Sequence, residues 1–182
     1  MGGPWPVSIE HVEGLGLCLI ATRDIEANEA FLRESPLLIT DVQTPGTKAA
    51  CSLQAFCGAS EAVRASVLAK FWSPMDMVSD MHRDCQKQVA QVAGATWAQD
   101  FDPLILQKAL LAFRLNAHSF SGGRLALFPV GSKIEHSCSP NSIFSDKIDQ
   151  KLGCHVATRR IVAGERISDN CALSSITPVF RL

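Results

Sequence analysis

Apolar side chains recur every three or four positions through the middle of the chain, which predicts a helical insert. Ser60 has the hydroxyl side chain that helix N-caps prefer, and Pro74 marks the end of the helix that follows it. The apolar face of this helix consists of Val63, Val67, Leu68 and Phe71. A second helix is predicted from about Met75 to Ala93, where Gly94 stops it.

A third predicted helix has clearer boundaries than the other two. Asp102 suits the N-cap, Pro103 suits the first helical position, and the apolar pattern ends near Asn116. One face of this helix carries Ile105, Leu106, Ala109, Leu110 and Phe113. This spacing is typical of a helix that packs one side against a core.

Short runs rich in β-branched and aromatic residues predict strands outside the insert. After the insert these runs are LALFPV (125–130), SIFSD (142–146), CHVATRRI (154–161) and RISD (166–169). Strands on both sides of a helical middle predict an α+β fold. The length of 182 residues fits a single domain.

Two segments near the ends of the chain resemble each other. ATRDIEANEAFL (21–32) and ATRRIVAGERIS (157–168) share Ala, Thr, Arg, Ile, Ala and Glu at matching offsets. Each predicts a strand, a tight turn at Ala-Asn or Ala-Gly, and a second strand. We expect two similar hairpins at opposite ends of one fold, with a chance similarity as the alternative.

Composition narrows the choice of function and compartment. A formal net charge of -1 leaves no basic surface for direct nucleic-acid binding. The longest apolar run, GLGLCLIA (14–21), is too short to span a membrane, and the N-terminus has no features of a secretory signal. The 7 Cys have no framework spacing, which predicts free thiols in a reducing compartment. An intracellular protein of the nucleus or cytoplasm is expected.

The stretch GSKIEHSCSPNSIF (131–144) concentrates the candidate chemistry. As a metal site it offers His136 and Cys138, with no second pair at ligand spacing. As a nucleophile, Cys138 would need a His elsewhere, and no oxyanion-hole signature surrounds it. As a turn, Ser-Pro-Asn is ordinary loop chemistry, and local spacing alone favours this interpretation.

Three motifs in a fixed order change that interpretation. They are GLGLCLIATRDIEANE near the N-terminus, LFPVGSKIEHSCSPN in the centre and VATRRIVAGERIS near the C-terminus. Together they resemble the SET domain of protein-lysine methyltransferases, which use S-adenosylmethionine. The helical insert and LNAHSF (115–120) make the chain most similar to the SET-and-MYND-like branch, without the MYND finger. The insert has Cys and His residues but no Cys-x-x-Cys pair, so no zinc site is expected.

The resemblance implies a fold and an activity. The fold is a SET-domain β-fold of short strands with a knot-like C-terminal segment and a helical insert. One domain is divided into N-terminal strands (8–48), the insert (49–116) and a C-terminal part (117–182), with no post-SET segment expected after it. The implied activity is methyl transfer from S-adenosylmethionine to a protein lysine, on a histone or another protein. The implied partner is that substrate, and a monomer without membrane contact is expected.

The first site assignment concerns glycines. Gly14 and Gly16 match the family's Gly-x-Gly motif, whose backbone approaches the cofactor closely, if two residues are inserted after them. An alignment without this gap pairs Gly16 with Cys18 instead. A plain turn before a buried strand is the alternative to either assignment.

Three further positions are assigned to the cofactor. Asn116 matches an Asn that touches the cofactor, although a helix C-cap explains it equally well. His136 matches a His whose backbone amide and carbonyl are expected to bind the adenine. Glu135 stands before it, in the place of a family Asn.

The remaining motif residues are assigned to packing. Ser137, Cys138, Pro140 and Asn141 match packing and turn residues, and Cys138 is expected to be a small buried side chain. With a turn at Gly164, the residues Glu165 and Ile167 are expected to form a strap over the His-Ser-Cys segment.

Two departures from the family pattern bear on activity. A carboxylate only accepts hydrogen bonds, so Glu135 suits the cofactor's ammonium but repels its carboxylate. Cys171 stands where the family has its catalytic Tyr, and the chain contains no Tyr at all. A thiol is a weaker donor than a phenol. The resemblance therefore implies either a methyltransferase with Cys171 at the catalytic position or a catalytically impaired SET pseudo-enzyme that binds protein or cofactor. A fragment of a longer gene product, without a function of its own, is a third reading.

Overall fold

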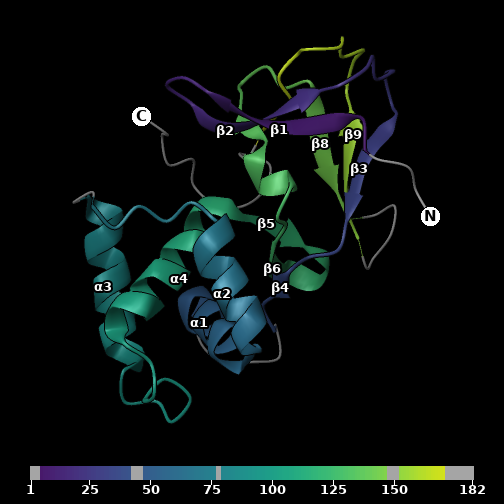
Figure 1. Cartoon of the computed structure of the whole chain (residues 1–182). Coiled ribbons are helices and arrows are strands. Elements are labelled where there is room, and N and C mark those ends of the chain that lie inside the picture. The colour runs from purple at the N-terminus through teal and green to yellow at the C-terminus, as the bar shows by residue number, and fades with distance from the viewer. Residues whose placement is uncertain (1–4, 42–46, 77–78, 147–151, 171–182) are drawn as a thin grey trace. The chain divides into compact units, whose positions relative to one another are not determined.

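The computed structural model describes residues 5–41, 47–76, 79–146 and 152–170. The chain forms two compact units (Figure 1). The first unit combines Met1–Pro36 with Phe128–Leu182, and the second is Leu37–Leu127. The helical insert of the sequence therefore falls within the second unit, together with short strands on either side of it.

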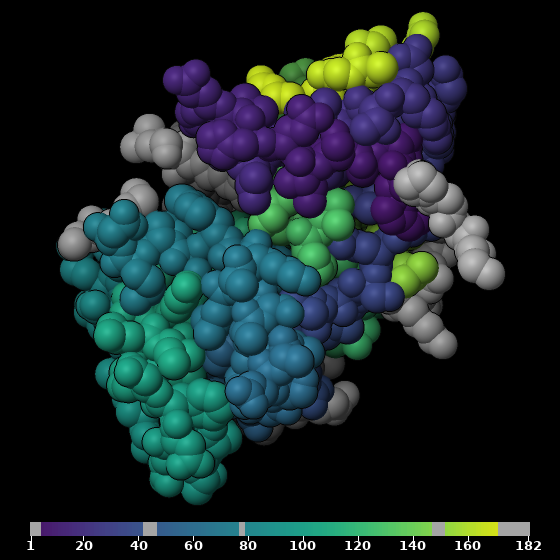
Figure 2. Space-filling model, in the orientation of Figure 1, coloured from purple at the N-terminus to yellow at the C-terminus, as the bar shows by residue number. Residues whose placement is uncertain are grey.

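The first unit contains an antiparallel hairpin and a larger mixed sheet. The hairpin joins β1 (Val7–Val12) to β2 (Gly16–Ala21), and Figure 2 shows it in purple at the surface. The larger sheet has the strand order β3-β9-β8-β10-β7. Its strands are β3 (Ala30–Glu34), β7 (Glu135–His136), β8 (Ser142–Ser145), β9 (Gly153–Ala157) and β10 (Ser168–Asp169). Strand β10 runs parallel to both β7 and β8, whereas the β3–β9 and β8–β9 pairs are antiparallel.

An apolar core holds this unit together. Its buried members are Leu19, Ala21, Ile25, Phe31, Leu32, Ile134, Ala157, Ile161 and Ile167. Complete burial of one large apolar side chain contributes about 1.5–3 kcal/mol. Because both echoing segments supply members, this core joins the two ends of the chain.

The echoing segments pair with each other, which corrects the expectation that they lie at opposite ends of the fold. Ile25 and Ile161 exchange two backbone hydrogen bonds of 2.9 Å. The Ala21 amide donates to the Glu165 carbonyl at 2.9 Å, and the equivalent Ala157 amide donates to the Glu29 carbonyl at 3.0 Å. The segments thus make the same backbone bonds in both directions.

Their turns, residues 23–29 and 159–165, are built alike, and we call them the Arg-Glu turns. Arg23 pairs with Glu29 at 2.7 Å, and Arg159 pairs with Glu165 at 2.6 Å. Left-handed backbone is needed in both, with φ of 68° at Asn28 and 84° at Gly164. Asn and Gly are the residues that tolerate this conformation best, which explains why the turns differ here without differing in shape.

The second unit packs four described helices with a three-stranded sheet. The helices are α1 (Lys48–Gly58), α2 (Glu61–Lys70), α3 (Asp80–Val92) and α4 (Pro103–Asn116). The sheet has the order β4-β6-β5, formed by Leu38–Ile39, Arg124–Leu127 and Ala117–Phe120. Helix α4 is the most buried of these helices, and the other three contact it.

Helix boundaries follow their caps. The predicted caps are confirmed: the Ser60 hydroxyl accepts from the Val63 amide at 3.4 Å, and the Asp102 carboxylate accepts from the Leu104 amide at 2.7 Å. The predicted start at Met75 was wrong, because Ser79 caps α3 and the helix begins at Asp80. Helix α1 was not predicted, although Thr47 caps it.

The predicted strands exist, but several predicted runs are longer than the strands: β9 ends at Ala157, β10 covers only Ser168–Asp169, and LALFPV is interrupted after Leu127. Strand β6 ends at Leu127, and a 3-10 turn at Gly131–Lys133 follows soon after. Pro129, which has no backbone N–H, lies between the two. No helix in the described residues is long and apolar enough to cross a bilayer.

Candidate functional site

The glycine motif forms the turn of the β1–β2 hairpin. Gly14 has φ of 76° and Gly16 has φ of 82°, and the Leu15 amide donates to the Val12 carbonyl at 3.1 Å. A Cβ added at either glycine would meet no atom within 4 Å. Glycine is therefore required here by the backbone conformation, and the space beside both residues is open.

A strap, residues 165–169, connects this hairpin to the His-Ser-Cys segment. The Ile167 amide donates to the Leu19 carbonyl of β2 at 2.8 Å, and the Ile167 carbonyl accepts from the Glu135 amide of β7 at 3.4 Å. The strap therefore bonds to both β2 and β7. The resemblance implied its contact with the His-Ser-Cys segment, whereas its contact with β2 was not predicted. The glycine turn and the His136 strand are attached to the same short piece of backbone.

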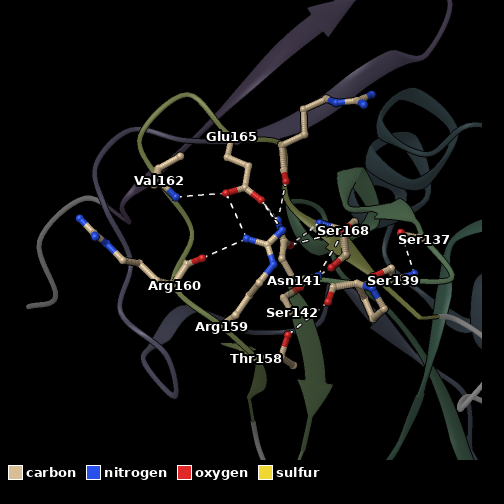
Figure 3. A network of polar contacts seen from close by, with 12 residues as sticks. Ser137, Ser139, Asn141, Ser142, Thr158, Arg159, Arg160, Val162, Glu165 and Ser168 are labelled. Atoms are coloured by element: carbon tan, nitrogen blue, oxygen red, sulfur yellow. Dashed lines mark hydrogen bonds and ion pairs between the residues drawn. The ribbon is translucent and has the colours of Figure 1, made fainter.

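Asn141 fixes the strap in place (Figure 3). Its Nδ2 donates to the Arg166 carbonyl at 2.8 Å and to the Glu165 carboxylate at 3.0 Å, and its Oδ1 accepts from the Ser168 amide at 2.8 Å. The side chain of Ser142 adds a bond to the Ser168 carbonyl at 2.9 Å. Asn141 is 2% exposed, so these bonds satisfy a buried amide and define its role as structural.

His136 lies on β7, the outer strand of the described five-stranded sheet. The amides of Glu135 and Ser137 donate toward the strap, Ser137 to the Asp169 carbonyl at 3.0 Å. Because successive residues of a strand present their backbone groups to opposite sides, the N–H and C=O of His136 face the outer edge. Such an edge is where a planar ligand can bind to backbone groups. The imidazole is exposed.

Glu135 has a charge partner that sequence reasoning missed. Its carboxylate Oε2 lies 3.2 Å from Nη1 of Arg166, the second residue of the strap. The Glu135 side chain is 21% exposed and that of Arg166 is 47% exposed. The sequence shows Arg166 only as a member of the AGERI motif. It does not indicate the pairing, because Glu135 and Arg166 are far apart in the chain.

Asn116 belongs to the second unit, where it ends α4. Its Nδ2 donates to the Trp72 and Ala112 carbonyls, both at 2.8 Å, and the residue is 5% exposed. Its Oδ1 is buried and accepts no hydrogen bond from the described residues. The donor side of this amide is thus structural, and its buried acceptor oxygen is unsatisfied among the described residues.

Two cysteine predictions have different outcomes. Cys138 is exposed, so the expectation of a buried side chain was wrong. The tertiary contacts that bury Asn141 and Ser142 do not extend to Cys138. Cys171, the position of the expected catalytic Tyr, lies outside the described residues.

Two carboxyl groups of the first unit are largely shielded from water, Glu34 on β3 and Asp169 on β10. Burial raises the pKa of the Glu34 carboxyl, which accepts from the Val130 amide at 3.0 Å and the Gly131 amide at 2.5 Å. Burial also raises the pKa of the Asp169 carboxyl, whose Oδ2 is 3.8 Å from Nδ1 of the buried His155. These groups were not predicted, because each occupies a strand position that usually carries an apolar residue.

Two of the insert thiols, those of Cys57 and Cys85, are unsuited to metal binding or nucleophilic chemistry at neutral pH. Burial raises the pKa of Cys57 and of Cys85 to about 11 in each case. A thiol is a metal ligand or nucleophile mainly as thiolate. In the part of the chain that the structure describes, no group of three or more His, Cys, Asp or Glu side chains could hold a metal ion.

Comparisons with known proteins agree with this geometry. The family model of the SET domain matches residues 16–172, so the chain belongs to the SET domain family. A search of curated proteins found no match.

Solved structures resemble the fold at low sequence identity. The SET domain of LSMT bound to lysine and AdoHcy superposes with a TM-score of 0.67 at 13% identity, covering 93% of this chain and 50% of that one. Rubisco LSMT bound to AdoMet gives 0.66 at 16% identity, covering 93% and 49%. Rubisco LSMT bound to sinefungin and monomethyllysine gives 0.62 at 15% identity, covering 91% and 48%. The chain spans about half the length of these proteins, and the likeness supports the SET fold.

Proposed function

We propose that this chain binds S-adenosylmethionine and transfers its methyl group to a lysine of a protein substrate. The observation that carries this proposal is the position of His136. Its backbone groups face the outer edge of β7, and the strap connects that strand to the hairpin with the open glycine turn. The solved neighbours are described as bound to AdoMet, AdoHcy or sinefungin, and two of them also to lysine or monomethyllysine.

The described residues fit such a cofactor. The positive φ and open space at Gly14 and Gly16 allow close approach of a ligand to the backbone. The backbone N–H and C=O of His136 lie on the outer edge of β7, and the resemblance implies that they bind the adenine. The acceptor at Asn116 Oδ1 is buried and unsatisfied among the described residues, and the assignment of Asn116 to the cofactor stays a prediction.

The cofactor supplies an electrophilic methyl group on a sulfonium, and the protein supplies alignment. In-line transfer to a neutral amine depends on holding the two reactants in register and on the electrostatic field around them. At the position of the family Tyr, Cys171 offers a weaker hydrogen-bond donor to orient the amine. Positioned groups of this kind contribute about 10²–10⁴-fold.

A second candidate function is binding without catalysis. The replacement at Cys171, in a chain without any Tyr, favours a SET pseudo-enzyme that binds cofactor or a protein. The variant Cys171→Tyr distinguishes the two functions. Methyl transfer by this variant and none by the wild type would assign the wild type to the pseudo-enzyme class.

The experiment that tests cofactor binding is a calorimetric titration of the purified chain with S-adenosylmethionine. We expect binding in the wild type and its loss in Gly16→Val, because a β-branched residue is strained at a φ of 82°. Gly58→Ala is the matched control, since an added Cβ there meets nothing within 4 Å. A folded wild-type chain that binds no cofactor would overturn the proposal.

The proposed substrate is a protein lysine, and its class is part of the same proposal. A net charge of -1 gives no reason to favour nucleosomal substrates over other proteins, so histone and non-histone lysines are both candidates. The assignment to the SET-and-MYND-like branch is also part of the proposal, supported by the helices between residues 48 and 116. Methylation of a lysine-peptide array by the full chain would identify the substrate class.

A further inference from the structure

We propose that Glu135 and Arg166 together bind the amino-acid end of the cofactor, with Arg166 supplying the donors that the carboxylate of Glu135 lacks. This inference rests on the proposed function. It assigns a binding role to Arg166, a strap residue that the sequence motifs left without one, and it explains how the chain accommodates a carboxylate at Glu135.

The geometry of the pair is set by backbone that has little freedom. Glu135 lies on β7, opposite Ser168 of the strap. Arg166 forms a bridge with Ile20 of β2, and its carbonyl accepts from Nδ2 of the buried Asn141. Both side chains therefore start from fixed positions, and their charged ends meet at 3.2 Å.

Glu135 depends on its charge partner more than Arg166 does, because Glu135 is the more buried of the two. The Glu135 side chain is only 21% exposed. Burying its charged carboxylate would therefore destabilise the folded state if no cation were nearby. The Arg166 side chain is 47% exposed, and among the described residues its guanidinium donates only to the Glu135 carboxylate. A guanidinium has five N–H donors, so most of those of Arg166 remain available to a ligand.

A Glu-Arg pair with accessible ends is complementary to a zwitterion. The amino-acid end of S-adenosylmethionine carries an ammonium and a carboxylate a few bonds apart. The ammonium fits the remaining lone pairs of Glu135, and the carboxylate fits the guanidinium of Arg166. A single amide could provide one donor and one acceptor, and here two side chains divide these tasks. Without Arg166, Glu135 would repel the ligand's carboxylate.

If the Glu135–Arg166 pair had only a structural role, its removal would have little effect. Partly exposed ion pairs contribute little to stability. If the pair served only the fold, its removal would change neither ligand affinity nor selectivity. The two roles therefore differ in a measurable quantity, which is affinity for ligands that carry the zwitterion relative to a ligand that lacks it.

The test compares S-adenosylhomocysteine with 5′-methylthioadenosine, which has the nucleoside and the sulfur but no amino-acid end. Affinities are measured by calorimetry on the full chain and on Arg166→Gln. We expect Arg166→Gln to weaken S-adenosylhomocysteine binding by about tenfold or more and to leave methylthioadenosine binding unchanged. Arg160→Gln is the matched control, because Arg160 is a more exposed arginine that pairs with Asp24 in the same unit.

The double variant Glu135→Gln/Arg166→Gln guards against a folding defect, because it removes both charges together. We expect it to melt close to the wild type and to lose the preference for S-adenosylhomocysteine. Equal effects of Arg166→Gln and Arg160→Gln would overturn the inference and leave the proposed function intact. Equal weakening of both ligands by Arg166→Gln would also overturn it. A folded wild type that binds neither ligand would instead reject the proposed function.

Discussion

Glu29 and Glu165 occupy equivalent places in the two Arg-Glu turns, but in the described residues only Glu165 also binds Asn141. Each carboxylate pairs with the Arg six residues before it and accepts the amide three residues before it, Glu26 and Val162 respectively. The extra 3.0 Å bond from Asn141 Nδ2 connects Glu165 to the strap. The two turns therefore share their internal ion pair and amide bond but differ in their other contacts, since Asp24 also accepts from the Ala163 amide at 2.9 Å and Glu165 also accepts from Asn141. Glu29 thus serves as a control for the bond between Glu165 and Asn141.

The variant Glu165→Gln is expected to lose stability in a pH-dependent way. Hydrogen bonds from Arg159 and Asn141 help lower the pKa of Glu165 from its ordinary 4.5 to about 2. A lowered pKa in the folded state means that the stabilisation is complete above about pH 4.5 and is lost as the pH falls toward 2. We expect Glu165→Gln to cost about 1–2 kcal/mol at pH 7 and almost nothing near pH 2.

The measurement is urea unfolding at a series of pH values, with Glu29→Gln as the control. The pKa of Glu29 is also lowered, chiefly by the hydrogen bond from Arg23, so this variant should follow the same pH trend with a smaller loss. Equal losses in the two variants would show that the bond from Asn141 adds nothing to the stability of the turn.

Asn141 is expected to be among the most sensitive polar side chains of the first unit. Asn141→Ala would leave the buried Ser168 amide and the Arg166 carbonyl without the partners they have in the wild type. An unsatisfied buried group costs about 1–3 kcal/mol, so we expect a loss of about 2–5 kcal/mol and a detached strap. Thermal unfolding and hydrogen exchange at the Ser168 amide check this. The exposed Ser139→Ala is the control, and a similar Tm for both variants would contradict the structural role of Asn141.

Gly153 is expected to tolerate no side chain. A Cβ there would lie 2.5 Å from Cε1 of Phe128 and 2.8 Å from Cε2 of Phe144, two rings whose centroids are 5.3 Å apart. Overpacking of a filled core costs about 1–3 kcal/mol, so Gly153→Ala should lower the free energy of unfolding by that amount. Gly58→Ala, where the added Cβ meets nothing, should be neutral or slightly stabilising in the same denaturant titration. An unchanged midpoint for Gly153→Ala would mean that the two rings can move apart.

Sequence reasoning succeeded where the signal is local. The caps at Ser60 and Asp102 depend on one side chain and an amide two or three residues away, so they were readable from the sequence. The similarity of the two Arg-Glu turns was also visible. Their mutual pairing was not, because the choice of a strand partner depends on packing across the whole unit.

The same limit applies to the site. The turn at Gly14 and Gly16 was readable from the sequence, because glycine favours left-handed backbone, and the assignment of these residues and of His136 to the cofactor stays a prediction. The partner of Glu135 could not be predicted, because Arg166 reaches it only through the pairing of the strap with β7. The exposure of Cys138 depends on which side of the strap it occupies, and no periodic pattern in so short a loop encodes that.

Asp169 is a buried carboxyl whose removal is expected to stabilise the protein at neutral pH. Burial raises its pKa above the ordinary 3.8, so ionisation costs the folded state more than the unfolded one. The sign is therefore opposite to that of Glu165: the cost is absent below about pH 3.8 and complete once the pH exceeds the raised value. We expect Asp169→Asn to gain about 1 kcal/mol at pH 7 and little near pH 3.5, because an amide oxygen can still accept from the Asn170 amide.

Two imidazoles near Asp169 bear on this expectation. Nδ1 of His155 is 3.8 Å from the Asp169 carboxylate, and the charge of His136 acts against burial to lower the pKa of Asp169. A protonated imidazole would compensate the charge of the carboxylate. Asp76→Asn, at an exposed position, is the control for the loss of one negative charge. Chemical unfolding between pH 3.5 and pH 8 gives the stability difference directly. A destabilised Asp169→Asn at pH 7 would contradict the prediction, whereas a gain that grows with pH identifies Asp169 as a buried acid of the strap whose charge is not compensated.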